Sequence, residues 1–87
     1  MAKYDIQVRP SVWKDVAKVP KKDLQEILVR IESLRDEPRS AASVKLSGWE
    51  YYRIRQGDYR IVYEIDDNHS IVTVAKVGHR GDVYRKK

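Results

Sequence analysis

Three consecutive runs of strand-forming residues in the second half of the chain constrain the fold most. Residues 51–55, 59–65 and 71–77 are dense in Tyr, Ile and Val, which are the side chains that fit a pleated, half-buried surface. Gln56-Gly57 and the stretch 66–69 separate these runs with turn-forming residues. Because connections this short join antiparallel neighbours, the sequence predicts a three-stranded meander.

The first half of the chain predicts one short strand followed by a helix. Apolar and polar side chains alternate over residues 4–8, the period of a half-buried strand, before Arg9-Pro10 breaks the pattern. Ser11 can then cap a helix over residues 12–19. Trp13 lies on the apolar side of this helix, so we expect it in the core.

A second helix is predicted to begin at Pro20 and to end at Glu37-Pro38. The link over residues 19–22 is too short to let the two helices separate, so they are expected to form an antiparallel hairpin. The apolar residues of the second helix follow helical spacing; they are Leu24, Ile27, Leu28, Ile31 and Leu34.

Together these elements predict a single α+β domain over residues 1–87. It has an N-terminal strand, an antiparallel two-helix hairpin on one face of a mostly antiparallel four-stranded sheet, and a short C-terminal helical segment. Residues 39–47 indicate a loop that leads into the sheet, with room for a brief strand at residues 44–46.

The composition excludes several classes of protein. Without cysteine the chain has no disulfide framework, thiolate nucleophile or cysteine-based zinc site. It has neither an apolar signal region nor the roughly 20 apolar residues that cross a bilayer, so we expect a cytoplasmic protein without a membrane partner. The net charge is +5, and residues 76–87 hold five basic side chains against one acidic. This excess favours polyanion binding, although charge alone fits an ordinary basic protein equally well.

The hairpin at Gln56-Gly57 sorts its side chains onto two faces. If these residues form a two-residue loop, Arg53 lies opposite Arg60 and Arg55 opposite Asp58. This register, like any other of the same parity, separates an apolar set from a basic set. The apolar set is Tyr52, Ile54, Tyr59 and Ile61, and the basic set is Arg53, Arg55 and Arg60.

Two interpretations of the basic set remain open at this point. Like charges opposite each other destabilise a sheet, so the cluster needs an explanation. It can form a polyanion pocket in which guanidinium forks grip phosphate. It can also be a solvated face with Asp58 and Glu64 as weak partners.

Two blocks of sequence give the chain a family resemblance. One is Tyr52-Arg53-Ile54-Arg55 with Gly57-Asp58-Tyr59-Arg60-Ile61-Val62-Tyr63, and the other is Val77-Gly78-His79-Arg80 with Tyr84. With the order of elements, they resemble the RelE family of the RelE/ParE toxin superfamily over nearly the whole chain. The resemblance implies two N-terminal helices packed on an antiparallel sheet, and a type II toxin that a cognate antitoxin protein binds and silences.

The resemblance also implies a metal-independent endoribonuclease, an mRNA interferase. It would cleave mRNA in the A site of the ribosome, beside 16S rRNA, and so inhibit translation. The ribose 2′-hydroxyl attacks the adjacent phosphate and leaves a 2′,3′-cyclic phosphate and a 5′-hydroxyl. No cofactor or metal is implied, and Glu64, Asp66 and Asp67 lack the spacing of a known metal site.

By this resemblance, four arginines belong to the catalytic site. Arg53 and Arg55 stand where relatives carry basic residues, often lysines; Arg60 takes the place of the phosphate-binding arginine, and Arg80 that of the arginine after the Val-Gly-x motif. Arginine is suited to holding the charge of a pentavalent phosphate. It is a poor acid or base, because its pKa above about 12 keeps the proton bound near neutral pH.

Proton transfer therefore falls to His79 and Tyr84. His79 occupies a variable position where several ribosome-dependent relatives carry His or Lys, and it is favoured over Tyr84 because the intrinsic pKa of histidine suits acid–base chemistry. A histidine beside a glycine is also an ordinary turn residue. Tyr84 matches the C-terminal aromatic that stacks on RNA or acts on a proton, and it could equally pack on the sheet.

Two other conspicuous residues have simpler interpretations. We expect His69 at the surface, and Trp49 either at the rim of the RNA-binding groove or partly buried.

Two other functions compete with RNA cleavage. A ParE-like inhibitor of DNA gyrase shares the fold but generally lacks the converging catalytic set. A catalytically decayed module would keep only its binding to the antitoxin. The joint presence of the arginines with Tyr84 favours the nuclease.

Overall fold

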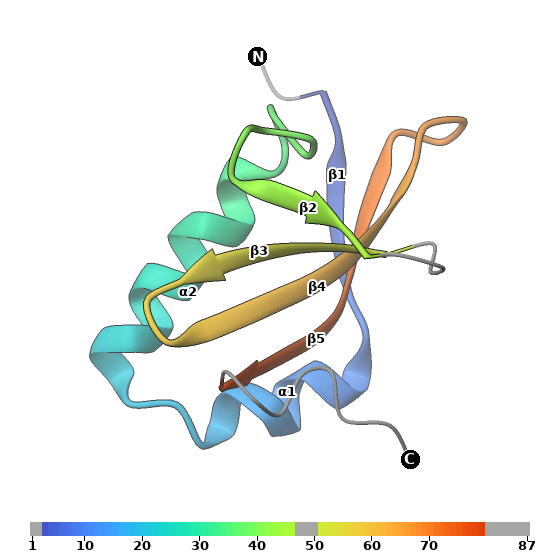
Figure 1. Cartoon of the computed structure of the whole chain (residues 1–87). Coiled ribbons are helices and arrows are strands. Elements are labelled where there is room, and N and C mark those ends of the chain that lie inside the picture. Colours follow the sequence, from blue (N-terminus) through green and yellow to red (C-terminus); the bar gives the residue numbers. More distant parts are fainter. Residues whose placement is uncertain (1–2, 47–50, 80–87) are drawn as a thin grey trace.

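The structure, a computed structural model, describes residues 3–46 and 51–79. In chain order its elements are β1 (Asp5–Val8), α1 (Pro10–Ala17), α2 (Lys21–Ser33), β2 (Ser43–Lys45), β3 (Tyr52–Gln56), β4 (Tyr59–Asp66) and β5 (Ile71–His79) (Figure 1). This is the predicted α+β order of one strand, two helices and a run of strands. The predicted C-terminal helical segment lies outside the described residues.

The sheet has five strands rather than the predicted four. Its order is β1-β5-β4-β3-β2, with β1 parallel to β5 and the other neighbours antiparallel. The fifth strand is the brief strand that the sequence allowed at residues 44–46. It forms one residue earlier, as β2, because Ser43, Val44 and Lys45 pair with the first residues of β3.

The first helix begins before the predicted cap. Pro10 lies in its first turn, where a fixed φ and a missing N–H cause no loss, and the extended Arg9 is the N-cap residue. Ser11 is therefore inside the helix and does not cap it. The second helix ends at Ser33, earlier than predicted, because residues 34–36 already form turns.

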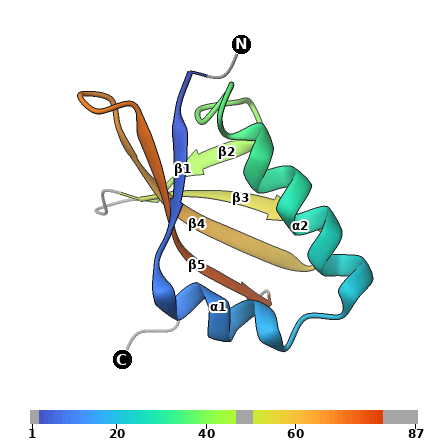
Figure 2. The same cartoon turned by 180° about the vertical axis from the view of Figure 1, so that it is seen from behind.

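The helices do not run side by side as the predicted antiparallel hairpin. α1 packs along β5 and α2 crosses β3 and β4, and both views show the helices diverging from their link (Figures 1 and 2). Extended backbone at Pro20 turns the chain between them. Each helix contributes its own apolar side chains to the core on the sheet.

A single buried cluster joins both helices to one face of the sheet, as predicted. It contains Val12 and Val16 of α1, Ile27 and Ile31 of α2, Leu34, and apolar side chains of the three central strands: Ile54, Ile61, Tyr63, Val72, Val74 and Val77. The strand side chains of this cluster alternate along the chain except between Val74 and Val77. There a β-bulge lets the pairing pass from Val62 opposite Lys76 to Tyr63 opposite Val74. All three valines of β5 therefore reach the core.

Trp13 is not a core residue. Its side chain is 59% exposed, whereas Val12 beside it is 2% exposed. The eight-residue helix presents only its Val12 and Val16 side to the sheet. Trp13 points elsewhere, because neighbouring residues of a helix lie on different faces.

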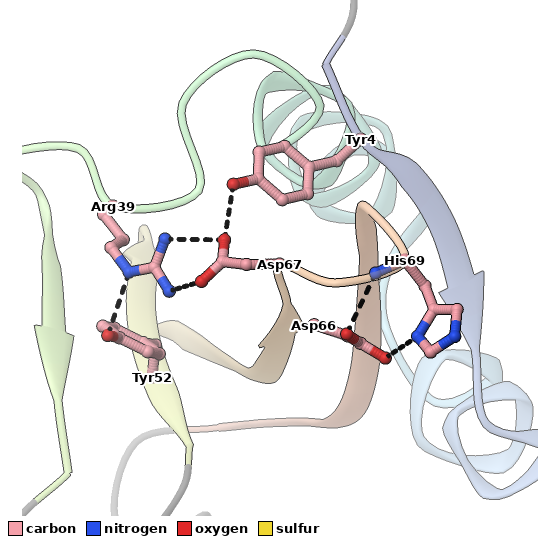
Figure 3. A network of polar contacts seen from close by, with 6 residues as sticks. All are labelled: Tyr4, Arg39, Tyr52, Asp66, Asp67 and His69. Carbon is pink, nitrogen blue, oxygen red and sulfur yellow. Dashed lines mark hydrogen bonds and ion pairs between the residues drawn. The ribbon is translucent and has the colours of Figure 1, made fainter.

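Polar side chains tie together the end of the sheet away from the Gly57 turn (Figure 3). Asp67, in the turn between β4 and β5, accepts hydrogen bonds from Tyr4 and from the guanidinium of Arg39 at 2.8 Å each. Arg39 also donates to the hydroxyl of Tyr52 at the start of β3. At the end of β4, the carboxylate of Asp66 accepts a hydrogen bond from the backbone N–H of His69 and lies 2.9 Å from its ring. His69 is at the surface, as predicted.

The Arg39–Asp67 contact predicts an acid-dependent loss of stability. The Arg39 guanidinium holds the pKa of Asp67 below its ordinary 3.8. The charged form is thus favoured in the folded state, and this stabilisation is complete above the ordinary pKa and lost as the pH falls through the lowered one. We expect Asp67→Asn to be less stable than wild type near neutral pH, with a difference that shrinks below about pH 4. Urea denaturation across this range measures it.

Asp36→Asn is the matched control, because Asp36 is exposed and lies on a turn after α2. It should be nearly as stable as wild type at neutral pH, where Asp67→Asn is destabilised. An Asp67→Asn difference that stays constant down to acid pH would contradict the role given to Arg39.

Candidate functional site

The hairpin turn lies one residue later than predicted. Gly57-Asp58 forms the two-residue loop, so that Arg55 lies opposite Arg60 and Arg53 opposite Val62. Gly57 has a φ of +61°, which glycine adopts without steric cost and which suits the first central position of a type II′ turn. The predicted pairing of Arg53 with Arg60 is wrong. The predicted sorting of the hairpin side chains onto an apolar and a basic face is confirmed.

Because the parity is confirmed, the arginines share the sheet face that points away from the helices. Ile54 and Ile61 lie opposite each other on the helix side and are 1% and 0% exposed. The alternating neighbours of these isoleucines therefore project to the other side. We call this set, Arg53, Arg55 and Arg60, the arginine face.

Arg60 lies beside a pocket at the hairpin turn. Its cross-strand partner is Gly78. Nε of Arg60 and of Arg53 is shielded from solvent, while Arg55 is exposed. A shallow pocket of about 70 Å³ opens at the turn and is lined by Arg55, Gly57, Asp58, Tyr59 and Arg60. Guanidinium groups held on paired strands beside a pocket suit the binding of an anion.

The opposite end of the same face is electrically balanced. Arg9 follows β1, and its guanidinium donates to Glu64 of β4 at 2.7 Å and to the hydroxyl of Tyr51 at 3.1 Å. It also lies 5.7 Å from the centre of the Tyr51 ring. Because Glu64 pairs with Arg9, the positive charge of this face is concentrated toward the Gly57 turn.

His79 lies on the other side of the sheet from the arginine face. It is the cross-strand partner of Tyr59, whose ring packs against the core, and the two rings meet edge to face at 5.5 Å. A cleft of about 300 Å³ opens there between the end of β5 and the last turn of α1. Its lining includes Lys18, Tyr59 and His79. The structure thus brings three predicted site residues together and sets His79 apart from them.

The remaining predictions for the site fall outside the described residues, namely Arg80, Tyr84 and Trp49. In the part of the chain that is described, no group of three His, Asp or Glu side chains could hold a metal ion. Within the same part, no helix is long and apolar enough to span a membrane.

Sequence comparison gives these features a family. Residues 6–84 match the family described as the ParE toxin of type II toxin-antitoxin system, parDE. The chain belongs to the RelE/ParE toxin superfamily. It is also 29% identical over 85 residues to toxin RelG of Mycobacterium tuberculosis, covering 95% of this chain and 98% of the relative.

Solved RelE structures share the fold of this toxin. RelE in the archaeal RelE–RelB complex from Pyrococcus horikoshii superposes with a TM-score of 0.81 at 26% identity, over 93% of this chain and 99% of the other. The isolated RelE toxin of E. coli gives a TM-score of 0.76 at 27% identity, over 93% and 90% of the two chains. The protein is therefore a RelE-like toxin of a type II toxin-antitoxin system.

The opposed pair Arg55 and Arg60 predicts a conflict between stability and charge. Removing one of two facing like charges should relieve their repulsion, so we expect Arg55→Gln to raise the free energy of unfolding by roughly 0.2–1 kcal/mol. The same change should weaken binding to a polyanion such as heparin. Urea denaturation and salt-dependent heparin elution measure the two effects.

Lys22→Gln provides the control, because it removes one positive charge from an exposed position on α2. It should leave stability nearly unchanged. An Arg55→Gln variant less stable than wild type would show that Arg55 stabilises the hairpin.

Proposed function

We propose that this toxin is a ribosome-dependent endoribonuclease that cleaves mRNA in the A site and so halts translation. The arginine face carries the proposal, since Arg53, Arg55 and Arg60 converge on one side of two paired strands. Strands hold side chains more firmly than loops do, which suits a site that must grip a phosphate in one geometry.

The arginine face supports the electrostatic part of the reaction. Attack of the ribose 2′-hydroxyl on the neighbouring phosphate builds negative charge on its non-bridging oxygens. Guanidinium groups already in place can stabilise that charge as it forms. Arg60 lines the pocket at the hairpin turn together with Arg55, and Arg53 extends the positive surface along the strand. We assign Arg80 to the same charge-binding set from its position in the sequence.

Proton transfer needs a different side chain. A general base must come within hydrogen-bond reach of the 2′-hydroxyl, and a general acid within reach of the leaving 5′-oxygen. With His79 on the helix side of the sheet, Tyr84 is the stronger of the two proposed proton-transfer residues. His79 would instead support Tyr59 at the end of the hairpin.

The relatives and the site together favour this reaction over gyrase inhibition. The matching family carries the ParE name, whereas the relative at 29% identity is RelG and the superposed structures are RelE toxins. A gyrase inhibitor has no need of three arginines gathered on one face of a strand pair. A decayed, antitoxin-binding module is the third candidate, and loss of RNA cleavage with a retained fold would identify it.

We also propose that a cognate antitoxin binds and silences this toxin. RelE from Pyrococcus horikoshii and RelE from E. coli have both been solved in complex with RelB. Their folds match this chain, so an equivalent partner is expected here. A small gene next to this one would encode it.

Substitution of Arg60 tests the proposed reaction directly. We expect induction of wild type to cleave translated transcripts, and Arg60→Ala to relieve toxicity by lowering cleavage about 100-fold or more, because donors to a developing oxyanion contribute on that scale. Primer extension on a translated reporter locates and quantifies the cuts. The variant should keep its fold, since Arg60 is outside the core cluster.

Arg35→Ala is the matched control, because it removes another arginine, from the residues after α2, where it pairs with Glu32. It should remain as toxic as wild type. Breaks in DNA with transcripts left intact would instead support the gyrase interpretation.

His79→Gln distinguishes the two roles of this histidine. Given its placement beside Tyr59, we expect single-turnover cleavage on programmed ribosomes to stay close to the wild-type rate. A loss of about 100-fold or more would be the signature of a general acid or base, and would return proton transfer to His79.

A further inference from the structure

The second half of β5 lacks a strand on its outer side, as far as the described residues show. β1 pairs only with residues 71–74 of β5, while β4 pairs with β5 as far as His79. Residues 75–79 therefore have one edge beyond the reach of β1. Helix α1 packs along this edge (Figures 1 and 2).

Asp15 of α1 takes the place of a strand at this edge. Its Oδ2 accepts a hydrogen bond from the backbone N–H of Val77 at 3.2 Å, and its Oδ1 lies 3.5 Å from Nζ of Lys76. The Asp15 side chain is 20% exposed. A hydrogen bond to a carboxylate in such a shielded place is stronger than one between neutral groups.

The carboxylate is itself held in place by the packing of α1. Val12 and Val16 anchor the helix in the core on either side of Asp15. The backbone N–H of Arg9, the N-cap residue, donates to the carbonyl of Val74 just before the free edge begins. Asp15 therefore contacts Val77 from a helix that is itself anchored in the core.

From this contact we infer that Asp15 is a positioning residue of the candidate site. By holding Val77, it keeps the end of β5 against β4, so that Gly78 stays beside Arg60 and His79 beside Tyr59. Strand ends fray, and glycine weakens a strand because it has no side chain to pack. The segment that flanks Arg60 therefore depends on its backbone contacts. The inference rests on the proposed function for its effect on catalysis, but not for its effect on the strand.

Asp15→Leu and Asp15→Asn separate the hydrogen bond from the charge. Leucine has similar size and no acceptor, while asparagine keeps an acceptor oxygen. For Asp15→Leu we expect the Val77 amide to exchange with solvent at least about tenfold faster, because a hydrogen bond to a charged group contributes on that scale. The cleavage rate at saturating ribosomes should fall by a comparable factor. Asp15→Asn should lie much closer to wild type in both measurements.

Two further variants distinguish positioning from simple destabilisation. Val16→Ala weakens the same helix from inside the core without touching the carboxylate, and Lys76→Met removes the partner of Oδ1 alone. Both should keep the saturating rate when assayed well below their melting temperatures. Exchange of the Ile61 amide, which lies in the buried centre of β4, reports global opening and corrects for it.

The inference is overturned if Asp15→Leu keeps both Val77 protection and the wild-type rate, or if Val16→Ala loses as much rate as Asp15→Leu. A wild-type protein that cuts no transcript on ribosomes would overturn the proposed function instead. In that case the Val77 exchange rates would still decide whether Asp15 holds the end of β5.

Discussion

The register of β3 against β4 determines where almost every other side chain of the toxin lies. It depends on the two-residue turn at Gly57-Asp58, which only a residue tolerant of positive φ can open without strain. With this register, Ile54 and Ile61 meet in the core and the arginines meet on the opposite face. A slip of one residue would bury guanidinium groups and expose the isoleucines at once. The cost of burying charge therefore protects the site and the fold together.

The sequence was sufficient for the features that depend on alternation. The meander, the side of the sheet that each hairpin residue faces and the N-terminal strand all follow from a period of two. The turn was misplaced by one residue, because Gln56-Gly57 and Gly57-Asp58 are both acceptable turn pairs. The assignment of side chains to the two faces was still correct. The loop kept two residues and moved by one along the chain, so each cross-strand partner changed by two residues. What changed was the partner of each arginine, with Arg55 rather than Arg53 facing Arg60.

Features that depend on long-range packing were harder to predict from the sequence. Nothing local in the helical segments shows that α1 lies along β5 while α2 crosses β3 and β4, and a short link suggested a paired hairpin instead. Trp13 was assigned to the core because it was placed on the apolar side of the predicted helix, although the helix is too short to bury more than one side. The separation of His79 from the arginines needed the pairing of β5 with β4 and the bulge, which alternation alone does not reveal. Asp15 was missed because a single acidic residue on a helix is normally solvated.

The division of the β3–β4 hairpin into an apolar and a basic face has an evolutionary consequence. Folding draws on Ile54, Ile61 and Tyr63, all of which are buried on the helix side. The arginines make no contribution to that core, so selection can alter them without loss of the folded state. On the proposed function, loss of the arginines would abolish the activity and leave the fold intact, and a partner that recognises the fold would still bind. A relative that folds in the same way without arginines at these positions would be an example of this change.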